Sequence, residues 1–132
     1  TGAASGIGAS LARRFEAEGA AAVVGADLRT DGIPVADAVV CDVARTESIR
    51  ELIDGAEARN GPIDLFCSNA GIGVADVGGS VEGASNADWT KIWEVNVMQH
   101  VYATRALLPK MIERGSGYFL ITASAAGLLS QP

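Results

Sequence analysis

The sequence predicts an α/β domain built on a parallel β-sheet, and three observations lead to that class. Short apolar runs alternate with segments of helical periodicity along the whole chain. These runs are almost continuously apolar, as strands covered on both faces are; they are residues 20–26, 35–41, 63–68 and 118–122. A glycine-rich turn, residues 1–8, leads directly into the first helical segment. Strands that alternate with helices favour a parallel sheet with right-handed crossovers.

Two helices are predicted in the first half of the chain. In residues 6–18, Ile7, Leu11 and Phe15 recur every fourth residue and should form one apolar stripe against the sheet. Residues 46–59 show the same periodicity. Their apolar face consists of Ile49, Leu52, Ile53 and Ala56.

The second half begins with a glycine-rich segment of weak pattern, residues 71–85, which we interpret as a loop near the site. A long helical stretch follows over residues 87–113, where apolar side chains cover more than one stripe. Pro109 is predicted to kink it, because proline has no N–H for the helix ladder.

Composition and charge exclude several functional classes. The chain has 132 residues, 48% apolar and 20% charged, which is typical of one globular domain. The net charge of −6 leaves no basic stripe for a nucleic acid. The sequence has no run of about 18 apolar residues, which is the length that a membrane span needs, and we therefore expect a cytoplasmic protein. Cys41 and Cys67 lie in strand-like runs without partners at disulfide or metal spacing, and are expected to be buried, reduced thiols.

The glycine-rich turn carries the first chemical signal. Its spacing is Gly2-x-x-x-Gly6-x-Gly8 at the start of a helix, where free N–H groups and the helix dipole favour a phosphate. Asp27 follows 19 positions after Gly8 at the end of the next strand. A carboxylate there can accept hydrogen bonds from ribose hydroxyls and repels a 2′-phosphate, which favours NAD over NADP. The alternatives are a plain chain reversal for the turn and a turn cap for Asp27.

With Thr1 in front, this loop resembles that of the short-chain dehydrogenases/reductases, in the ordinary single-domain branch. The resemblance continues through motifs in the family's order and spacing. These motifs are Asp42-Val43, Ser68-Asn69-Ala70-Gly71, Val95-Asn96-Val97 and residues 121–127. The family implies a Rossmann-like, doubly wound parallel sheet.

Each motif implies a role by resemblance. The cofactor-binding residues would be Gly2, Ser5, Gly6, Ile7, Gly8, Asp27, Asp42, Val43, Asn69, Ala70 and Gly71. Ser124 would orient the substrate oxygen, and Asn96 would support a proton relay from a locally distorted helix. From the pattern alone, Asp42 could instead form an Asx turn, Asn96 could face solvent, and Ser124 could cap a turn. The only histidine, His100, is assigned no role.

The resemblance also implies parts that these residues do not contain. The family's catalytic Tyr, with a Lys four residues later, is expected beyond Pro132, since Tyr102 and Tyr118 lack that Lys. The first strand, expected between the strands ending at Asp27 and Asn69, is absent as well. We therefore interpret residues 1–132 as a partial NAD-binding domain truncated at both ends. Alone it should be inactive and unstable, with a groove between those two strands.

The function implied by the resemblance is an oxidoreductase that passes a hydride between NAD, less readily NADP, and a small-molecule alcohol or carbonyl. The alternative is a non-catalytic dinucleotide-binding or sensing module on the same fold, although Ser124 and Asn96 together argue against it. A homodimer or homotetramer is expected through residues 87–113, because their apolar surface is wider than docking on a sheet requires.

Overall fold

Helices and strands alternate along the chain in the computed structural model, which describes residues 1–77 and 79–128. The elements are α1 (Gly6–Ala17), β1 (Val24–Asp27), β2 (Asp37–Val40), α2 (Thr46–Asn60), β3 (Leu65–Ser68), η1 (Val74–Val77), α3 (Asn86–Trp93), η2 (Glu94–Met98), α4 (Gln99–Arg114), β4 (Tyr118–Ile121) and η3 (Ala125–Gly127). Both strand pairs are parallel, which confirms the predicted α/β class. Each strand is shorter than the apolar run that predicts it.

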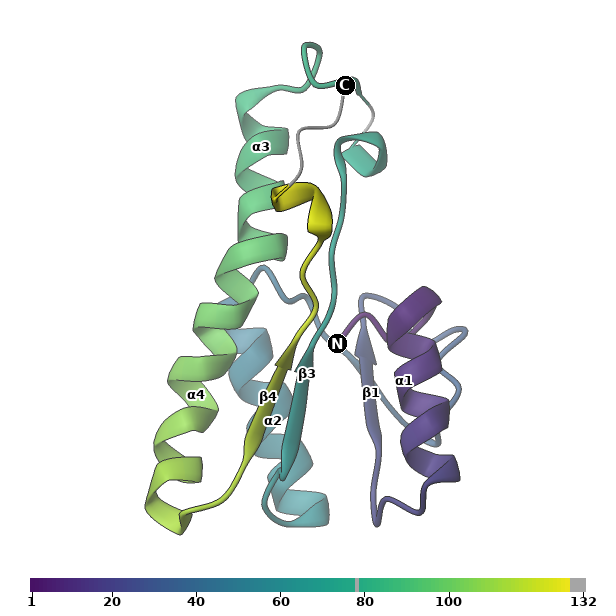
Figure 1. Ribbon diagram of the computed structural model, residues 1–132, viewed down its shortest axis with the longest axis vertical. Coiled ribbons are helices and arrows are strands. Elements are labelled where there is room, and N and C mark those ends of the chain that lie inside the picture. The colour runs from purple at the N-terminus through teal and green to yellow at the C-terminus, as the bar shows by residue number, and fades with distance from the viewer. Residues whose placement is uncertain (78, 129–132) are drawn as a thin grey trace.

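The strands form two separate parallel pairs in the described part of the chain. β1 pairs with β2, with Val24 opposite Asp37, and β3 pairs with β4, with Leu65 opposite Tyr118. Figure 1 shows β1 and α1 beside the β3–β4 pair, which α4 and α2 cover on the other side. The N-terminus lies between β1 and β3 (Figure 1).

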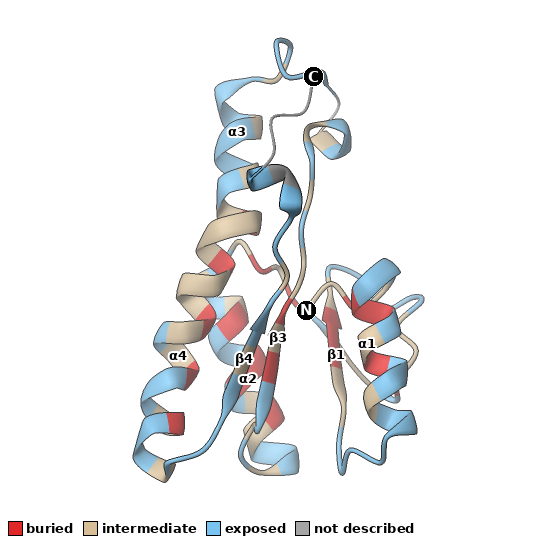
Figure 2. Ribbon diagram, viewed as in Figure 1, coloured by how far each residue is buried: buried red, intermediate tan, exposed pale blue. Residues whose placement is uncertain are grey.

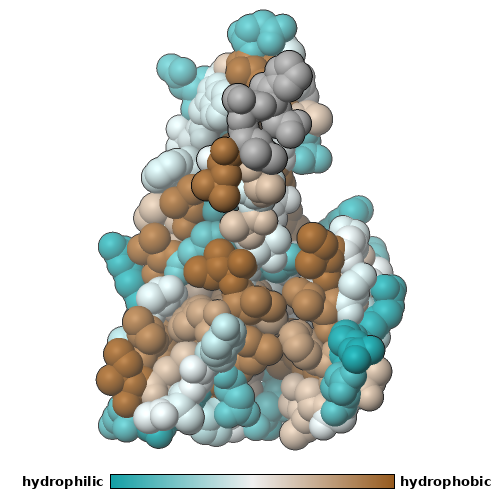
Figure 3. All heavy atoms as spheres, in the orientation of Figure 1, coloured by the Kyte–Doolittle hydropathy of each residue, from teal (hydrophilic) through white to brown (hydrophobic). Residues whose placement is uncertain are grey.

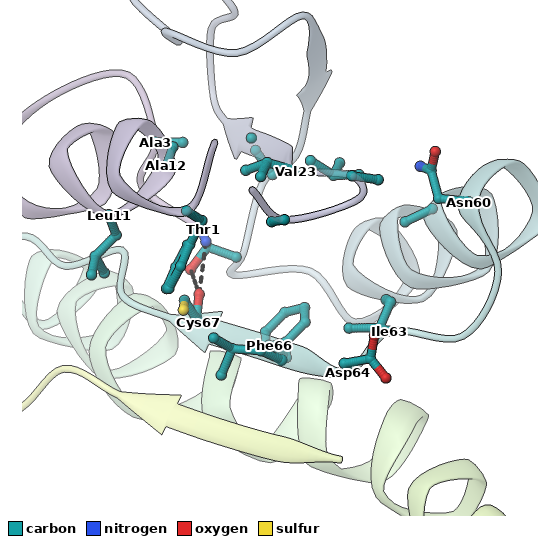
Figure 4. Close-up of a pocket in the computed structure, with 18 of the residues that line it drawn as sticks. Thr1, Ala3, Leu11, Ala12, Val23, Asn60, Ile63, Asp64, Phe66 and Cys67 are labelled. Carbon is teal, nitrogen blue, oxygen red and sulfur yellow. Dashed lines mark hydrogen bonds between the residues drawn. The ribbon is translucent and has the colours of Figure 1, made fainter. Parts of the chain in front are cut away.

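The first residues bridge the two strand pairs at one end. Thr1 N donates to the Cys67 carbonyl at 2.8 Å, and Ala3 N donates to the Ala26 carbonyl at 3.1 Å. Alongside this bridge, a cleft of about 330 Å³ runs between β1 and β3. Figure 4 shows its lining, which is mainly apolar and includes Leu11, Val23, Ile63 and Phe66. The predicted groove between the strands ending at Asp27 and Asn69 is thus confirmed.

The core lies between the strands and the two long helices. Ile53 of α2 and Ala103 and Leu107 of α4 are fully buried and belong to one hydrophobic cluster with Phe66 of β3. Figure 2 shows buried residues on the sides of α2 and α4 that face the strands. Figure 3 shows that apolar side chains also gather on the visible face of the strands. In β4, Ile121 is 48% exposed.

The apolar stripe predicted for the first helix is only partly correct. Leu11 and Phe15 line the cleft, but Ile7 is 61% exposed. The buried positions of α1 are small residues, among them Gly8 and Ala12. Small side chains are used there because α1 packs closely on the loop that precedes it.

The long helical stretch is distorted at Asn96, as the family resemblance implies, and it is not ended at Pro109. A π-helical turn, Glu94–Met98, separates α3 from α4, whereas α4 continues through Pro109. Arg105 and Pro109 are both exposed, so the Arg105 carbonyl that loses its helix partner lies near solvent. Pro109 thus does not end the helix, and the irregular turn of this stretch is the π turn around Asn96.

Both cysteines are free thiols, as predicted. Cys41 is buried but Cys67 only half-buried, and burial raises the pKa of both thiols. Among the described residues, no helix is long and apolar enough to cross a membrane.

Candidate functional site

The glycine-rich loop is packed so tightly that two of its glycines cannot be replaced without movement. A Cβ at Gly8 would lie 2.0 Å from the Gly2 carbonyl oxygen. A Cβ at Gly2 would lie 2.9 Å from Ala70 Cα, and Gly2 has a positive φ of 69°. The backbone can approach this closely only because no side chain intervenes.

The opposite side of the loop is open. Gly6 has a φ of 51°, and a Cβ there would meet nothing within 4 Å. Ser5, the N-cap of α1, makes no side-chain capping bond. The first intrahelical bond is that of Ala9 N to Ser5 O, so the N–H groups of Gly6, Ile7 and Gly8 point out of the helix start. Open space, unpaired N–H groups and the helix dipole together suit an anion.

Asp27 lies directly beside this loop. Its Oδ2 accepts the Ala4 N–H at 3.0 Å, and its Oδ1 accepts the Leu28 N–H at 2.8 Å. The carboxylate is half-buried and held by two backbone donors. It therefore keeps a fixed position at the end of β1, with acceptor capacity left for further hydroxyl donors.

The turn after β3 is bound to the same loop through Thr1. Thr1 Oγ1 accepts the N–H groups of Asn69 and Ala70 at 3.0 and 3.1 Å. Asn69 Nδ2 in turn donates to the Thr1 carbonyl at 3.1 Å. The two predicted cofactor segments, residues 1–8 and 69–71, therefore form one continuous edge.

Asn96 projects from the π turn toward the loop after β3. Its Oδ1 accepts the Ile72 N–H at 2.9 Å, and its Nδ2 donates to the Ile72 carbonyl at 2.8 Å. The interpretation of Asn96 as a solvent-facing residue is therefore wrong, because both ends of the carboxamide are paired. This clamp places Asn96 next to Gly71, whose hypothetical Cβ lies 3.5 Å from Oδ1.

Ser124 is exposed just beyond the end of β4. Two residues earlier, Thr122 Oγ1 donates to Asn69 Oδ1 at 2.7 Å, which ties the end of β4 to the turn after β3. The segment that carries Ser124 thus leaves the sheet at the edge that also carries the glycine-rich loop and Asn69.

Asp42 and Val43 follow β2. Asp42 Oδ1 accepts the Ala44 N–H at 3.1 Å, which forms an Asx turn leading into α2. The Val43 side chain is 6% exposed and belongs to the core. The turn that the sequence left as an alternative is present, and the second oxygen of the Asp42 carboxylate takes no part in it.

No role was predicted for His100 from the sequence, and Gln99 was not singled out. His100 Nδ1 lies 2.6 Å from Ser68 Oγ. Desolvation lowers the pKa of His100, against a smaller opposing effect of a hydrogen bond to the Asn96 backbone. Gln99 is fully buried and also contacts Ser68. The signal for Gln99 was a second neutral amide in the long helical stretch, three residues after Asn96.

Comparison with known proteins agrees with this arrangement. The family model for short chain dehydrogenases matches residues 1–132. The chain is 35% identical to 1-deoxy-11-beta-hydroxypentalenate dehydrogenase from Streptomyces avermitilis, over 98% of the chain and 52% of that protein. It is 33% identical to dehydrogenase/reductase SDR family member 4 from Bos taurus, over 96% of the chain and 48% of that protein.

Solved structures show the same likeness. A short-chain dehydrogenase from Novosphingobium aromaticivorans matches with a TM-score of 0.85 at 32% identity, covering 98% of this chain and 52% of that one. A metagenomic short-chain oxidoreductase in complex with NADP matches with a TM-score of 0.87 at 28% identity, covering 98% of this chain and 62% of that one. The chain spans about half the length of the curated relatives it matches. It belongs to the short-chain dehydrogenase family.

Proposed function

We propose that the natural protein containing these residues, as a member of the short-chain dehydrogenases, transfers hydride between a nicotinamide dinucleotide and a small alcohol or carbonyl compound. One observation carries the proposal. The glycine-rich loop, Asp27 and the Asn69 turn converge at the carboxyl ends of parallel strands, linked by direct hydrogen bonds. Open α/β sheets bind their ligands at this edge.

The fit of a dinucleotide rests on the shape of the loop. In this proposal the open side at Gly6, with the N–H groups of Ile7 and Gly8, holds the pyrophosphate. Asp27 accepts from the adenosine ribose hydroxyls. Residues 42–43 border the adenine, and residues 69–71 border the second ribose. The bound cofactor would supply the hydride chemistry, and this chain supplies binding and orientation.

Ser124 and Asn96 are assigned to the reacting end. Ser124 donates its hydroxyl to the substrate oxygen, where charge builds up in the transition state. Asn96 acts from the π turn by holding the loop at Ile72 and supporting the proton relay. The Tyr that the family uses as acid and base is not among these 132 residues, so the proposal assigns it no position here.

The preferred cofactor is proposed to be NAD(H). Asp27 Oδ2 is bound to the loop at Ala4 N, so its negative charge cannot turn away from a 2′-phosphate without breaking that bond. Neither Ala4 nor Ser5 supplies a positive charge to compensate. The metagenomic short-chain oxidoreductase of similar structure is in complex with NADP. The cofactor preference of this protein is therefore tested by direct measurement.

The test is titration of NAD⁺ and NADP⁺ into the wild-type natural protein and its Asp27→Ala variant by calorimetry. We expect NAD⁺ to bind at least about tenfold more tightly than NADP⁺ in the wild type, because an unpaired charge close to a phosphate costs at least about 1.4 kcal/mol. Asp27→Ala should weaken the binding of NAD⁺ and reduce the ratio of the NADP⁺ Kd to the NAD⁺ Kd.

Asp31→Ala is the matched control, since Asp31 is exposed and its loss changes the net charge equally. If Asp31→Ala reduced this ratio of Kd values as much as Asp27→Ala does, the preference for NAD⁺ would come from the overall negative charge of the protein. A wild type that prefers NADP⁺ would overturn the assignment. Failure to bind either dinucleotide would overturn the proposed function itself.

We further propose that the protein is a homo-oligomer that uses the α3–α4 stretch. Trp89 and Trp93 lie four residues apart on α3, and so on one helix face, and are 44% and 59% exposed. Two tryptophans on one face form an apolar surface of the kind that symmetric interfaces bury.

A further inference from the structure

Gln99 is the most deeply buried polar side chain in the described residues. Its exposure is 0%, and the other buried polar residue of that part of the chain, Ser68, is adjacent to it at 1%. A polar group without water must find its partners in the protein, or it costs about 1–3 kcal/mol. Its partners therefore indicate what the side chain holds in place.

The two ends of the Gln99 carboxamide face different kinds of group. Oε1 lies 3.2 Å from Thr1 Oγ1 and 3.4 Å from Ser68 Oγ. Nε2 donates to the carbonyls of Ala70 and Val95. Carbonyls can only accept, so the nitrogen must face them, and the orientation of the amide is determined by its surroundings.

One of these bonds is made to a carbonyl that, in a regular α-helix, accepts a backbone N–H. In an α-helix the Gln99 N–H would donate to the Val95 carbonyl, four residues earlier. Here the Gln99 N–H donates to Glu94 O instead, five residues earlier, as a π turn requires. Gln99 Nε2 takes over the Val95 carbonyl at 2.5 Å. The side chain therefore satisfies a carbonyl that the π turn would otherwise leave unpaired.

We infer that Gln99 is a positioning residue that stabilises the π turn presenting Asn96 and links this turn to the glycine-rich loop through Thr1. Without the extra residue of the π turn, the helix would rotate Asn96 by roughly 100°, away from Ile72. One carboxamide thus couples the loop proposed to bind the pyrophosphate with the turn proposed to serve the proton relay. The inference rests on the proposed function for its effects on dinucleotide affinity and on turnover, whereas amide exchange tests the positioning of the turn independently.

The test compares Gln99→Met, which keeps the side-chain length and removes the hydrogen bonds, with Leu107→Ala. Leu107 is equally buried in α4 but lies in the hydrophobic cluster. Amide exchange of Ile72 is measured by NMR in the natural protein, relative to the core amide of Ile53 to correct for global unfolding. We expect Gln99→Met to raise the ratio of the Ile72 exchange rate to the Ile53 exchange rate at least about tenfold. Leu107→Ala should leave this ratio unchanged.

The affinity for the dinucleotide gives a second readout. In Gln99→Met the Kd should rise about tenfold, because the Thr1 hydroxyl loses the nearer of its two acceptors, Gln99 Oε1 at 3.2 Å, and keeps only the Cys67 carbonyl at 3.4 Å. Leu107→Ala should leave the Kd unchanged. An unchanged Ile72 ratio in Gln99→Met, or an equal acceleration in Leu107→Ala, would overturn the inference.

A measurement on the wild type keeps the inference testable if the variant does not fold. The side-chain NH₂ protons of Gln99 should exchange with solvent far more slowly than those of Asn86, which is exposed at the start of α3. Equal exchange rates would contradict the contacts on which the inference depends. If Ile72 exchange accelerates in Gln99→Met while kcat does not change, the positioning of the turn holds and the role proposed for Asn96 fails.

Discussion

Gly8→Ala should be destabilising although it places a better helix former inside a helix. Alanine is favoured over glycine by about 1 kcal/mol in a helix interior. At Gly8, however, the new Cβ would lie 2.0 Å from the Gly2 carbonyl oxygen. The atoms must separate by about 1.5 Å to reach a normal contact, and such overpacking costs about 1–3 kcal/mol. We expect a net loss of up to about 2 kcal/mol in the free energy of unfolding.

The same substitution at Gly55 is the matched control. Gly55 lies inside α2, and its hypothetical Cβ meets only the end of the Arg59 side chain at 3.2 Å. Gly55→Ala should therefore stabilise the protein by about 0.5–1 kcal/mol. Unfolding in urea measures both variants, and calorimetry with NAD⁺ should show weaker binding for Gly8→Ala alone. A Gly8→Ala variant that is as stable as the wild type and binds NAD⁺ equally would refute the packing argument.

Two further predictions concern His100 and the proposed oligomer. Desolvation lowers the pKa of His100 below its ordinary value of 6.5, so the unfolded chain takes up the proton first. The stability that depends on neutral His100 is therefore complete above pH 6.5 and is lost as the pH falls below that value. Urea unfolding at pH 7.5 and 5.5 should show a smaller decrease in the free energy of unfolding for His100→Asn than for the wild type. For the oligomer, light scattering should give a dimer or tetramer that Trp93→Glu dissociates, and a strictly monomeric wild type at micromolar concentration would contradict the proposal.

Several features could be predicted from short stretches of sequence because local rules govern them. The alternation of apolar runs and helical periodicity predicted the α/β class, and glycines at positions 2, 6 and 8 predicted a tight turn open to an anion. The groove between the strands ending at Asp27 and Asn69 followed from the family's strand order. The bounds of the strands were less predictable, since an apolar run such as residues 20–26 continues beyond the residues that find a pairing partner.

The sequence by itself determined the periodicities and the backbone freedom of the loop, because these depend on residues within a turn or two of each other. The tertiary structure alone decided which polar groups meet. Asn96 pairs with Ile72 across 24 residues, and Gln99 reaches Thr1 across 98. No local pattern encodes such pairs, because a buried amide is satisfied by whichever carbonyls and hydroxyls the packed segments bring to it. The family resemblance implied a distorted helix at Asn96, but the tertiary structure decided which group stabilises it. Gln99 Nε2 donates to the Val95 carbonyl, and only the folded chain holds this side chain beside Thr1 and Ala70.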